Sequence, residues 1–257
     1  MSSNICGAGG DSWNAQYAFD FATGGGLAEA LFGKVIGLPS DNVAHSGDST
    51  EETMGLAMRT KIERIMPGKQ YFLLTAGGDD FIGDPLPEYV LPNDGKTAPE
   101  DAVRWASFNT ALDATANDYA ALLDIRDKLA PDCLLLTQSY DVPPPEVMGE
   151  AVTLAGVIVA GPWISPTMNY LGWTKPADMS KIMRVMLAAF QARIQKLHDA
   201  RPTNWVHTNT QGMLPPGSFA NELHLYPAGC LLLAEQINAN RIRYELLPPA
   251  TIEPETA

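Results

Sequence analysis

The stretch Gly9-Gly10-Asp11-Ser12-Trp13 follows a short strand candidate, Asn4–Ala8, and precedes a helix candidate that contains Tyr17, Phe21 and Leu27. The pattern predicts a strand, a tight turn and a helix. Glycine lets the chain turn sharply and lets a substrate approach the backbone. Free N–H groups at the start of a helix favour negative charge. A serine at such a turn is therefore a candidate nucleophile, although Gly, Asp and Ser are also common in ordinary turns and helix caps.

The rest of the chain alternates between predicted strands and helices. Besides the first run, four apolar runs read as buried strands: Asn42–Ser46, Gln70–Ala76, Cys133–Gln138 and Trp205–Thr208. Helices are predicted after the capping boxes Ser49–Glu52 and Thr97–Glu100, over the apolar stripe from Met179 to Leu197, and from Pro227 onward. This alternation predicts an α/β fold with a parallel sheet of about five strands.

Two long segments without clear periodicity follow the third and fourth strands. They cover residues 81–98 and 140–176, and they carry prolines and aromatic residues. Long loops in compact domains are usually functional or disordered. We expect them to be ordered walls of a pocket within a single domain that covers residues 1–257.

Composition limits the classes of function. The chain has 257 residues, 46% hydrophobic residues and a formal net charge of −13, without a Lys/Arg run. This disfavours a nucleic-acid binder and fits a neutral or cationic small-molecule substrate. Its three cysteines are far apart and are expected to be buried thiols. No signal peptide and no apolar stretch of about 20 residues is visible, so we expect a cytoplasmic protein without a membrane span. The sequence leaves the oligomeric state open.

Chemically active residue types follow four of the five predicted strands. They are Ser12 after the first, Ser46–Ser49 after the second, Gly77–Asp80 after the third, and Asn221-Glu222-Leu223-His224 after the fifth. The carboxyl ends of parallel strands meet at one sheet edge, where ligands bind. A hydroxyl, a base and backbone N–H donors are what acyl transfer needs.

These segments resemble the blocks of the SGNH, or GDSL-type, serine hydrolases. Gly10-Asp11-Ser12 is similar to the first block, and the segment around Gly47 to the second. Gly77-Gly78-Asp79-Asp80 is similar to the third block, Gly-x-Asn-Asp, and Asn221–His224 to the fifth, Asp-x-x-His. They occur in family order and span nearly the whole chain.

The resemblance implies a three-layer α/β/α, flavodoxin-like fold with insertions after strands 3 and 4. It also implies an esterase that cleaves short-chain acyl esters and needs no cofactor and no metal. Ser12 takes the place of the nucleophile and His224 that of the base, while Ser49 of the second Gly-Asp-Ser is read as a helix N-cap. The N–H groups of Ser12 and Gly47 take the places of oxyanion donors. The pocket is expected to include Trp13, Asp80, Tyr140 and Trp163.

Two positions depart from the family pattern. Asp79 replaces the oxyanion-hole asparagine, and a carboxyl group can donate there only when burial or neighbouring charge keeps it protonated. Asn221 replaces the aspartate that orients the histidine; the adjacent Glu222 could supply the carboxylate instead, or could equally be a solvated turn residue.

Because of these two departures, a second function remains an alternative: the protein could bind a ligand on the same fold with weakened catalysis. A third reading, a nucleotide or flavin binder that uses Gly7-x-Gly9-Gly10 as a phosphate loop, lacks the glycine expected at position 12. Among the other histidines, His198 and His207 are predicted to be structural. His45 is predicted to be a pocket neighbour or a core residue.

Overall fold

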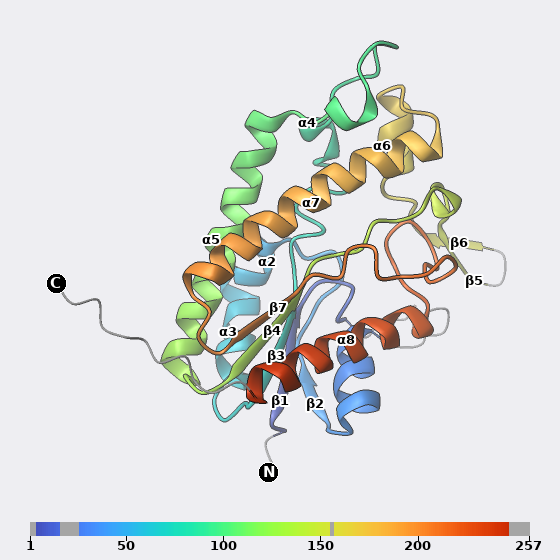
Figure 1. Cartoon of the computed structure of the whole chain (residues 1–257). Coiled ribbons are helices and arrows are strands. Elements are labelled where there is room, and N and C mark those ends of the chain that lie inside the picture. The colour runs from blue at the N-terminus through green and yellow to red at the C-terminus, as the bar shows by residue number, and fades with distance from the viewer. Residues whose placement is uncertain (1–3, 16–25, 155–156, 247–257) are drawn as a thin grey trace.

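The computed structural model describes residues 4–15, 26–154 and 157–246. Its centre is a five-stranded, all-parallel sheet in the order β2-β1-β3-β4-β7. The strands are β1 (Cys6–Gly10), β2 (Ser40–Asn42), β3 (Tyr71–Thr75), β4 (Leu134–Gln138) and β7 (Trp205–Thr208). The predicted α/β architecture is confirmed (Figure 1).

Helices cover both faces of this sheet (Figure 1). The π-helix η1 (Glu29–Ile36) packs with α8 (Pro227–Leu246) on one side. On the other side lie α2 (Thr50–Met54), α3 (Leu56–Ile65), α5 (Trp105–Leu129) and α7 (Pro176–Ala200). The three central strands are buried along nearly their whole length because helices cover them from both sides.

Several predicted boundaries shift. The first strand runs to Gly10 rather than to Ala8, so it ends directly before Asp11. The second strand is Ser40–Asn42 and not Asn42–Ser46, although the N–H groups of Val43 and His45 still donate to carbonyl oxygens of Ala8 and Gly10. The predicted helix through Tyr17 and Phe21 lies outside the described residues.

The two segments predicted to be irregular contain short elements. The first holds α4 (Leu86–Tyr89), and a 3-10 turn, η2 (Pro99–Asp101), follows it. The second holds the 3-10 turn η3 (Pro145–Val147), an antiparallel pair of strands, β5 (Val152–Leu154) and β6 (Val157–Ala160), and α6 (Ser165–Tyr170). Both segments lie beyond the carboxyl ends of the central strands (Figure 1).

No helix within residues 4–15, 26–154 and 157–246 combines the length and the hydropathy that a membrane span requires. The three cysteines, Cys6, Cys133 and Cys230, are buried free thiols, as expected from their apolar surroundings.

Candidate active site

The turn after β1 places Ser12 at the carboxyl edge of the sheet. Gly10 has φ +107°, and a Cβ atom there would lie 1.7 Å from the carbonyl oxygen of Thr75 on β3. The Asp11 N–H donates to that same oxygen at 2.8 Å. Only glycine therefore permits this close approach of β1 to β3, and the approach fixes where the chain turns into Ser12.

Asp11 is almost completely buried within this turn. Its Oδ1 accepts the Trp13 N–H at 3.0 Å, and its Oδ2 accepts the hydroxyl of Tyr140. Burial raises the pKa of the Asp11 carboxyl to about 6, against the effect of these two donors.

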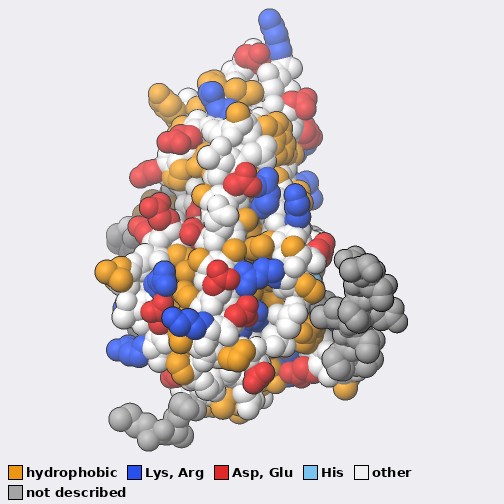
Figure 2. Space-filling model, turned by 90° about the vertical axis from the view of Figure 1, so that its left-hand side faces the viewer, with side chains coloured by type: hydrophobic (Ala, Val, Ile, Leu, Met, Phe, Trp, Pro, Cys, Tyr) orange, Lys and Arg blue, Asp and Glu red, His pale blue; other side chains and the backbone are white. Residues whose placement is uncertain are grey.

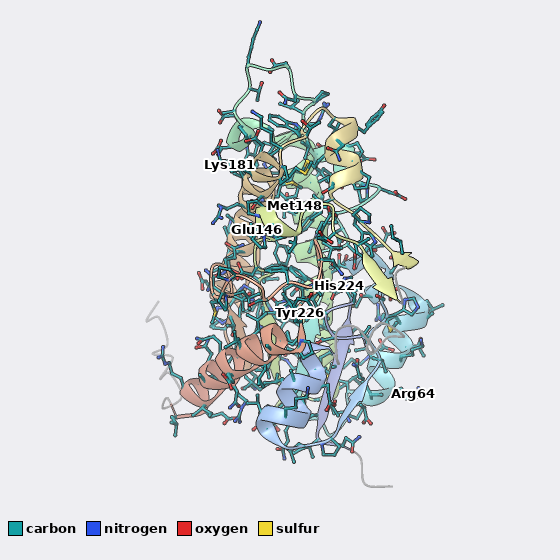
Figure 3. The ribbon with its side chains drawn as sticks, turned by 90° about the vertical axis from the view of Figure 1, so that its right-hand side faces the viewer. Arg64, Glu146, Met148, Lys181, His224 and Tyr226 are labelled. Carbon is teal, nitrogen blue, oxygen red and sulfur yellow. The ribbon has the colours of Figure 1, made fainter. Side chains whose placement is uncertain are left out.

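His224 lies in a turn that Asn221 organises. The side-chain oxygen of Asn221 accepts the backbone N–H groups of Leu223 and His224, both at 2.9 Å, and it lies 3.2 Å from Nδ1 of the His224 ring. An amide oxygen only accepts, so this contact assigns the ring proton to Nδ1 and leaves Nε2 as an acceptor. Figure 3 labels His224 just beyond the ends of the strands.

The environment of the His224 ring is apolar. The edge of the Trp163 ring packs against it with the centroids 5.2 Å apart. Burial lowers the pKa of the imidazole to about 4. At neutral pH the ring is therefore uncharged and able to accept a proton.

One hydrogen bond connects the serine turn to the histidine turn. Trp13 Nε1 donates to the backbone oxygen of Leu223 at 3.1 Å, across 210 positions of sequence. Trp13 follows Ser12 and Leu223 precedes His224, so the bond sets these two turns side by side. No hydrogen bond joins the Ser12 hydroxyl to the His224 ring within the described part of the chain.

Glu222 accepts hydrogen bonds from backbone N–H groups, and it is Asn221 that contacts the His224 ring. Its fully buried carboxylate accepts four backbone N–H groups, at Gly149, Trp163, Ile164 and Ser165, over 2.6 to 3.3 Å. Three of these lie at the start of α6, where N–H groups lack partners within the helix. Glu222 thus fixes the second insertion to the histidine turn, and the ring contact belongs to Asn221.

Asp141, which no sequence motif singles out, fixes the loop that leads from β7 to His224. Its Oδ1 accepts the N–H groups of Val142 and Gly212, and its Oδ2 accepts that of Leu214, all within 2.9 Å. The two distant N–H groups belong to the loop that leads from β7 to His224. Asp141 directly follows the predicted pocket residue Tyr140 and comes shortly after the end of β4. This position is the signal in the sequence that could have identified it.

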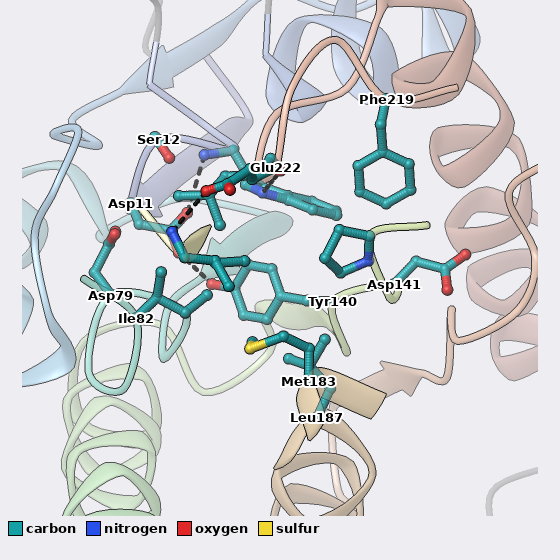
Figure 4. A pocket seen from close by; sticks show the side chains of 15 residues that line it. Asp11, Ser12, Asp79, Ile82, Tyr140, Asp141, Met183, Leu187, Phe219 and Glu222 are labelled. Atoms are coloured by element: carbon teal, nitrogen blue, oxygen red, sulfur yellow. Dashed lines mark hydrogen bonds between the residues drawn. The ribbon is translucent and has the colours of Figure 1, made fainter. Parts of the chain in front are cut away.

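A cavity opens beside Ser12 and has a volume of about 410 Å³ including its mouth. Figure 4 shows its lining, with Ser12 and Asp79 on one side and Met183 and Leu187 of α7 opposite. The apolar lining residues are Trp13, Ile82, Tyr140, Pro143, Ile164, Met183, Leu187, Phe219 and Leu223, and the polar ones are Asp11, Ser12, Asp79, Asp141 and Glu222. An apolar pocket with a few polar groups is typical of small-molecule sites.

Two of the four predicted pocket residues line the cavity, and two do not. Trp13 and Tyr140 line the cavity, whereas Trp163 lies against His224 and Asp80 points elsewhere. Both Asp80 oxygens accept from Thr50, at 2.9 Å from its N–H and 2.6 Å from its hydroxyl. Asp80 therefore holds the third loop to α2 and is not a pocket residue.

Asp79 contributes to the wall of the cavity beside Ser12 and Gly78. Burial, followed by the charge of Asp11 and then of Asp80, raises the pKa of the Asp79 carboxyl to about 8. A pKa in this range favours the protonated form of the side chain at pH 7.

The second loop contains Gly47 at φ +81° and the predicted helix cap. Ser49 accepts the N–H of Glu52, and the Glu52 carboxylate accepts the N–H of Ser49, so the capping box is confirmed. His45 is not a core residue, since its side chain is 59% exposed and its Nδ1 lies 2.6 Å from Asp48.

The remaining histidines have structural contacts. His207 lies between Thr137 and Gln191, and burial lowers its pKa to about 3. His198 contacts the backbone oxygen of Trp205 at 3.2 Å. Across the described ranges, no three His, Cys, Asp or Glu side chains are grouped as metal ligands would be.

No protein-family model and no curated protein matches the chain by sequence. Solved structures match its fold, which is the fold of the SGNH, or GDSL-type, hydrolases. An extracellular lipase from Streptomyces rimosus matches with a TM-score of 0.55 at 15% identity, over 91% of this chain and 98% of the lipase. The lipase Lip_vut3 from a goat rumen metagenome matches with a TM-score of 0.56 at 13% identity, over 91% of this chain and 96% of that one. At such identities the matches establish the fold alone.

Proposed function

We propose that the protein is a serine esterase that hydrolyses carboxylic esters with short acyl groups. The observation that carries the proposal is the bond from Trp13 to the Leu223 oxygen, which brings the turn of Ser12 beside the turn of His224. The neutral His224 ring, with its proton held at Nδ1, supports a role as general base. The likeness of the fold to two lipases supports the same chemistry.

The reaction proceeds through an acyl-enzyme. The Ser12 oxygen attacks the ester carbonyl carbon while His224 Nε2 takes the hydroxyl proton. The N–H groups of Ser12 and Gly47, together with the neutral Asp79 carboxyl, hydrogen-bond the oxyanion that forms. The intermediate then expels the alcohol, to which His224 returns the proton. Water attacks the acyl-enzyme by the same route and releases the acid.

The size and lining of the cavity support a short acyl group. It is small, largely apolar and closed at one side by buried side chains of α7. We expect a short acyl chain to be accommodated there more readily than a long one.

Labelling with a fluorophosphonate tests the proposal. The reagent phosphonylates an activated serine with loss of fluoride, and mass spectrometry of the peptides identifies which serine carries it. We expect the label on Ser12, and Ser12→Ala should abolish both labelling and hydrolysis of p-nitrophenyl acetate while the protein stays folded. Ser49→Ala is the matched control, since it removes a helix cap worth about 1 kcal/mol and keeps activity.

A ligand-binding protein on the same fold is the second candidate. The replacement of the family's two polar residues by Asp79 and Asn221 is the observation that favours it. Binding of an ester without turnover and without labelling of Ser12 would establish this candidate and reject the esterase.

A further inference from the structure

Four carboxyl side chains line the cavity: Asp11, Asp79, Asp141 and Glu222. Among the described residues that line it there is no Lys, Arg or His. Burying a carboxylate without a counter-ion is costly unless hydrogen bonds stabilise it or it keeps a proton. The charge state of each of these four carboxyl groups therefore depends on how many hydrogen-bond donors reach it.

The donors are distributed unequally. Glu222 accepts four backbone N–H groups and Asp141 accepts three. Asp11 accepts two donors, the Trp13 N–H and the Tyr140 hydroxyl. The described residues give the Asp79 carboxyl no hydrogen-bond donor, so it gains least from ionisation.

Tyr140 is held firmly in the position that serves Asp11. Its ring meets the Trp13 ring edge-on with centroids 4.9 Å apart, and it packs so closely on Gly78 that a Cβ there would lie 3.2 Å from it. Figure 4 shows the Tyr140 hydroxyl directed at Asp11. The same side chain thus connects the turn after β1 to the loop that carries Asp79.

We propose that Tyr140 and Asp11 are positioning residues: the Tyr140 hydroxyl fixes negative charge on Asp11, and that charge keeps a proton on Asp79. The inference rests on the proposed function only in its last step, in which the protonated Asp79 donates to the oxyanion. A carboxylic acid held neutral in an apolar site is a known kind of oxyanion donor. This arrangement lets an aspartate do the work of the family's asparagine.

Other charged groups that face Asp79 act in the same direction. Asp80 in the same loop, Asp48 just before α2 and Glu52 in the first turn of α2 all raise the pKa of Asp79, after the larger effects of burial and Asp11. Burial raises the pKa of the Asp80 carboxyl itself, against three hydrogen bonds that favour its charged form, from the Thr50 N–H and hydroxyl and from the Thr115 hydroxyl. Burial raises the pKa of both carboxyls, and that of Asp79 is raised further, so we place the proton that this pair shares on Asp79.

The first test is the pH profile of kcat/KM for p-nitrophenyl acetate. The parent enzyme should lose activity as pH rises through about 8, because Asp79 ionises. Asp11→Asn removes the neighbouring charge and should move this loss about one unit toward lower pH. Tyr140→Phe should move it in the same direction, because Asp11 then holds the proton more strongly.

Two variants make this test specific. In Asp79→Asn the alkaline loss should disappear, and adding Asp11→Asn should no longer shift the profile. Tyr119→Phe is the matched control, because it also removes one buried tyrosine hydroxyl, bound at 2.7 Å to the Ala76 oxygen. It should lower stability without moving the profile, whereas a shift equal to that of Tyr140→Phe would overturn the proposal.

The second test needs no enzymatic activity. A protonated carboxyl has a carbonyl stretch in the infrared that an ionised one lacks. We expect this band at pH 7, its loss in Asp79→Asn, and its titration at lower pH in Asp11→Asn. Persistence of the band in Asp79→Asn overturns the placement of the proton, even if Ser12 proves to be the nucleophile. The expected band without any ester hydrolysis upholds the placement of the proton and rejects the esterase.

Discussion

In the proposed mechanism, Asn221 occupies the position where a carboxylate would orient the base, His224, and stabilise its charged form. Its oxygen already caps two backbone N–H groups, which a carboxylate oxygen can also accept. We therefore predict that Asn221→Asp keeps the turn and raises the His224 pKa from about 4 toward neutrality. Because the reverse change in a serine protease costs about 10⁴-fold in rate, a gain of at least ~10-fold in kcat is expected.

The pH dependence of p-nitrophenyl acetate hydrolysis checks this prediction. On the acidic side of the profile, the parent should lose activity as pH falls toward about 4, where the ring becomes charged. In Asn221→Asp this acidic loss should begin at higher pH. Asn238→Asp, an equal change of charge on α8, should leave rate and profile unaltered. An unchanged or lower kcat in Asn221→Asp would show that the ring is not the base.

Sequence reasoning at this scale succeeds where the partners are close along the chain. The capping box at Ser49 involves residues three positions apart, and the contact between Asn221 and His224 spans the same distance. The roles of Asp141 and Glu222 escape it because their donors lie 57 to 73 positions away, apart from the adjacent Val142. Nothing local in the sequence separates a carboxylate that faces a histidine from one that faces distant backbone.

At the scale of elements, Glu222 fixes the second insertion by accepting N–H groups at Gly149 and at the start of α6. Glu222→Gln replaces one acceptor oxygen by an amide group that can only donate. We predict a loss of about 2–4 kcal/mol in the free energy of unfolding, measured by urea denaturation. The matched control Glu235→Gln, at an exposed position of α8, should change stability by less than about 0.5 kcal/mol. Equal losses in the two variants would contradict the anchoring role.

The floor of the cavity belongs to α7, through Met183 and Leu187. We predict that Leu187→Ala deepens the cavity and shifts the preference of the enzyme from acetyl toward longer acyl esters, at a cost of about 2–5 kcal/mol in stability. The ratio of kcat/KM for p-nitrophenyl butyrate to that for the acetate is the measurement. Ile194→Ala, buried on the same helix but away from the cavity, should lose comparable stability and keep the ratio. If both variants change the ratio alike, the floor does not select the acyl group.

Local propensity predicts most elements and fails where tertiary contacts override it. The starts of β7 and α8 at Trp205 and Pro227 agree with the prediction. The Thr97–Glu100 capping box instead gives only a 3-10 turn, and α5 begins at Trp105. Val103 pairs with Val90 in an isolated bridge, which keeps the chain extended just before the helix.

For the molecule as a whole, charge is the property that composition gives directly. The net charge is −13, and Figure 2 shows acidic and basic side chains interspersed on one face. The carboxyl-lined cavity contributes the same sign locally. We predict that kcat/KM at low ionic strength is higher for an acetyl ester of a quaternary-ammonium alcohol than for a neutral ester, and lowest for one that carries a carboxylate. Raising the salt to about 1 M, where the Debye length is about 3 Å, should reduce these differences. If kcat/KM depended neither on the charge of the ester nor on the salt concentration, this electrostatic selection would be refuted.

Strand order is the feature of the whole molecule that periodicity does not reveal. The sheet pairs β1 with β3, and β7 with β4, so neighbours in space are far apart in sequence. The order follows from packing of complete helices and strands, and single segments of the sequence do not encode it.

The late position of β7 has a consequence for synthesis on the ribosome. The strand that pairs with β4 and leads to His224 is made some 190 residues after Ser12. At roughly 5–20 residues per second, a nascent chain carries Ser12 for about 10 to 40 seconds before that strand and His224 exist. If the proposed mechanism holds, ester hydrolysis would therefore begin only after His224 has been made, and its onset would time the completion of the sheet.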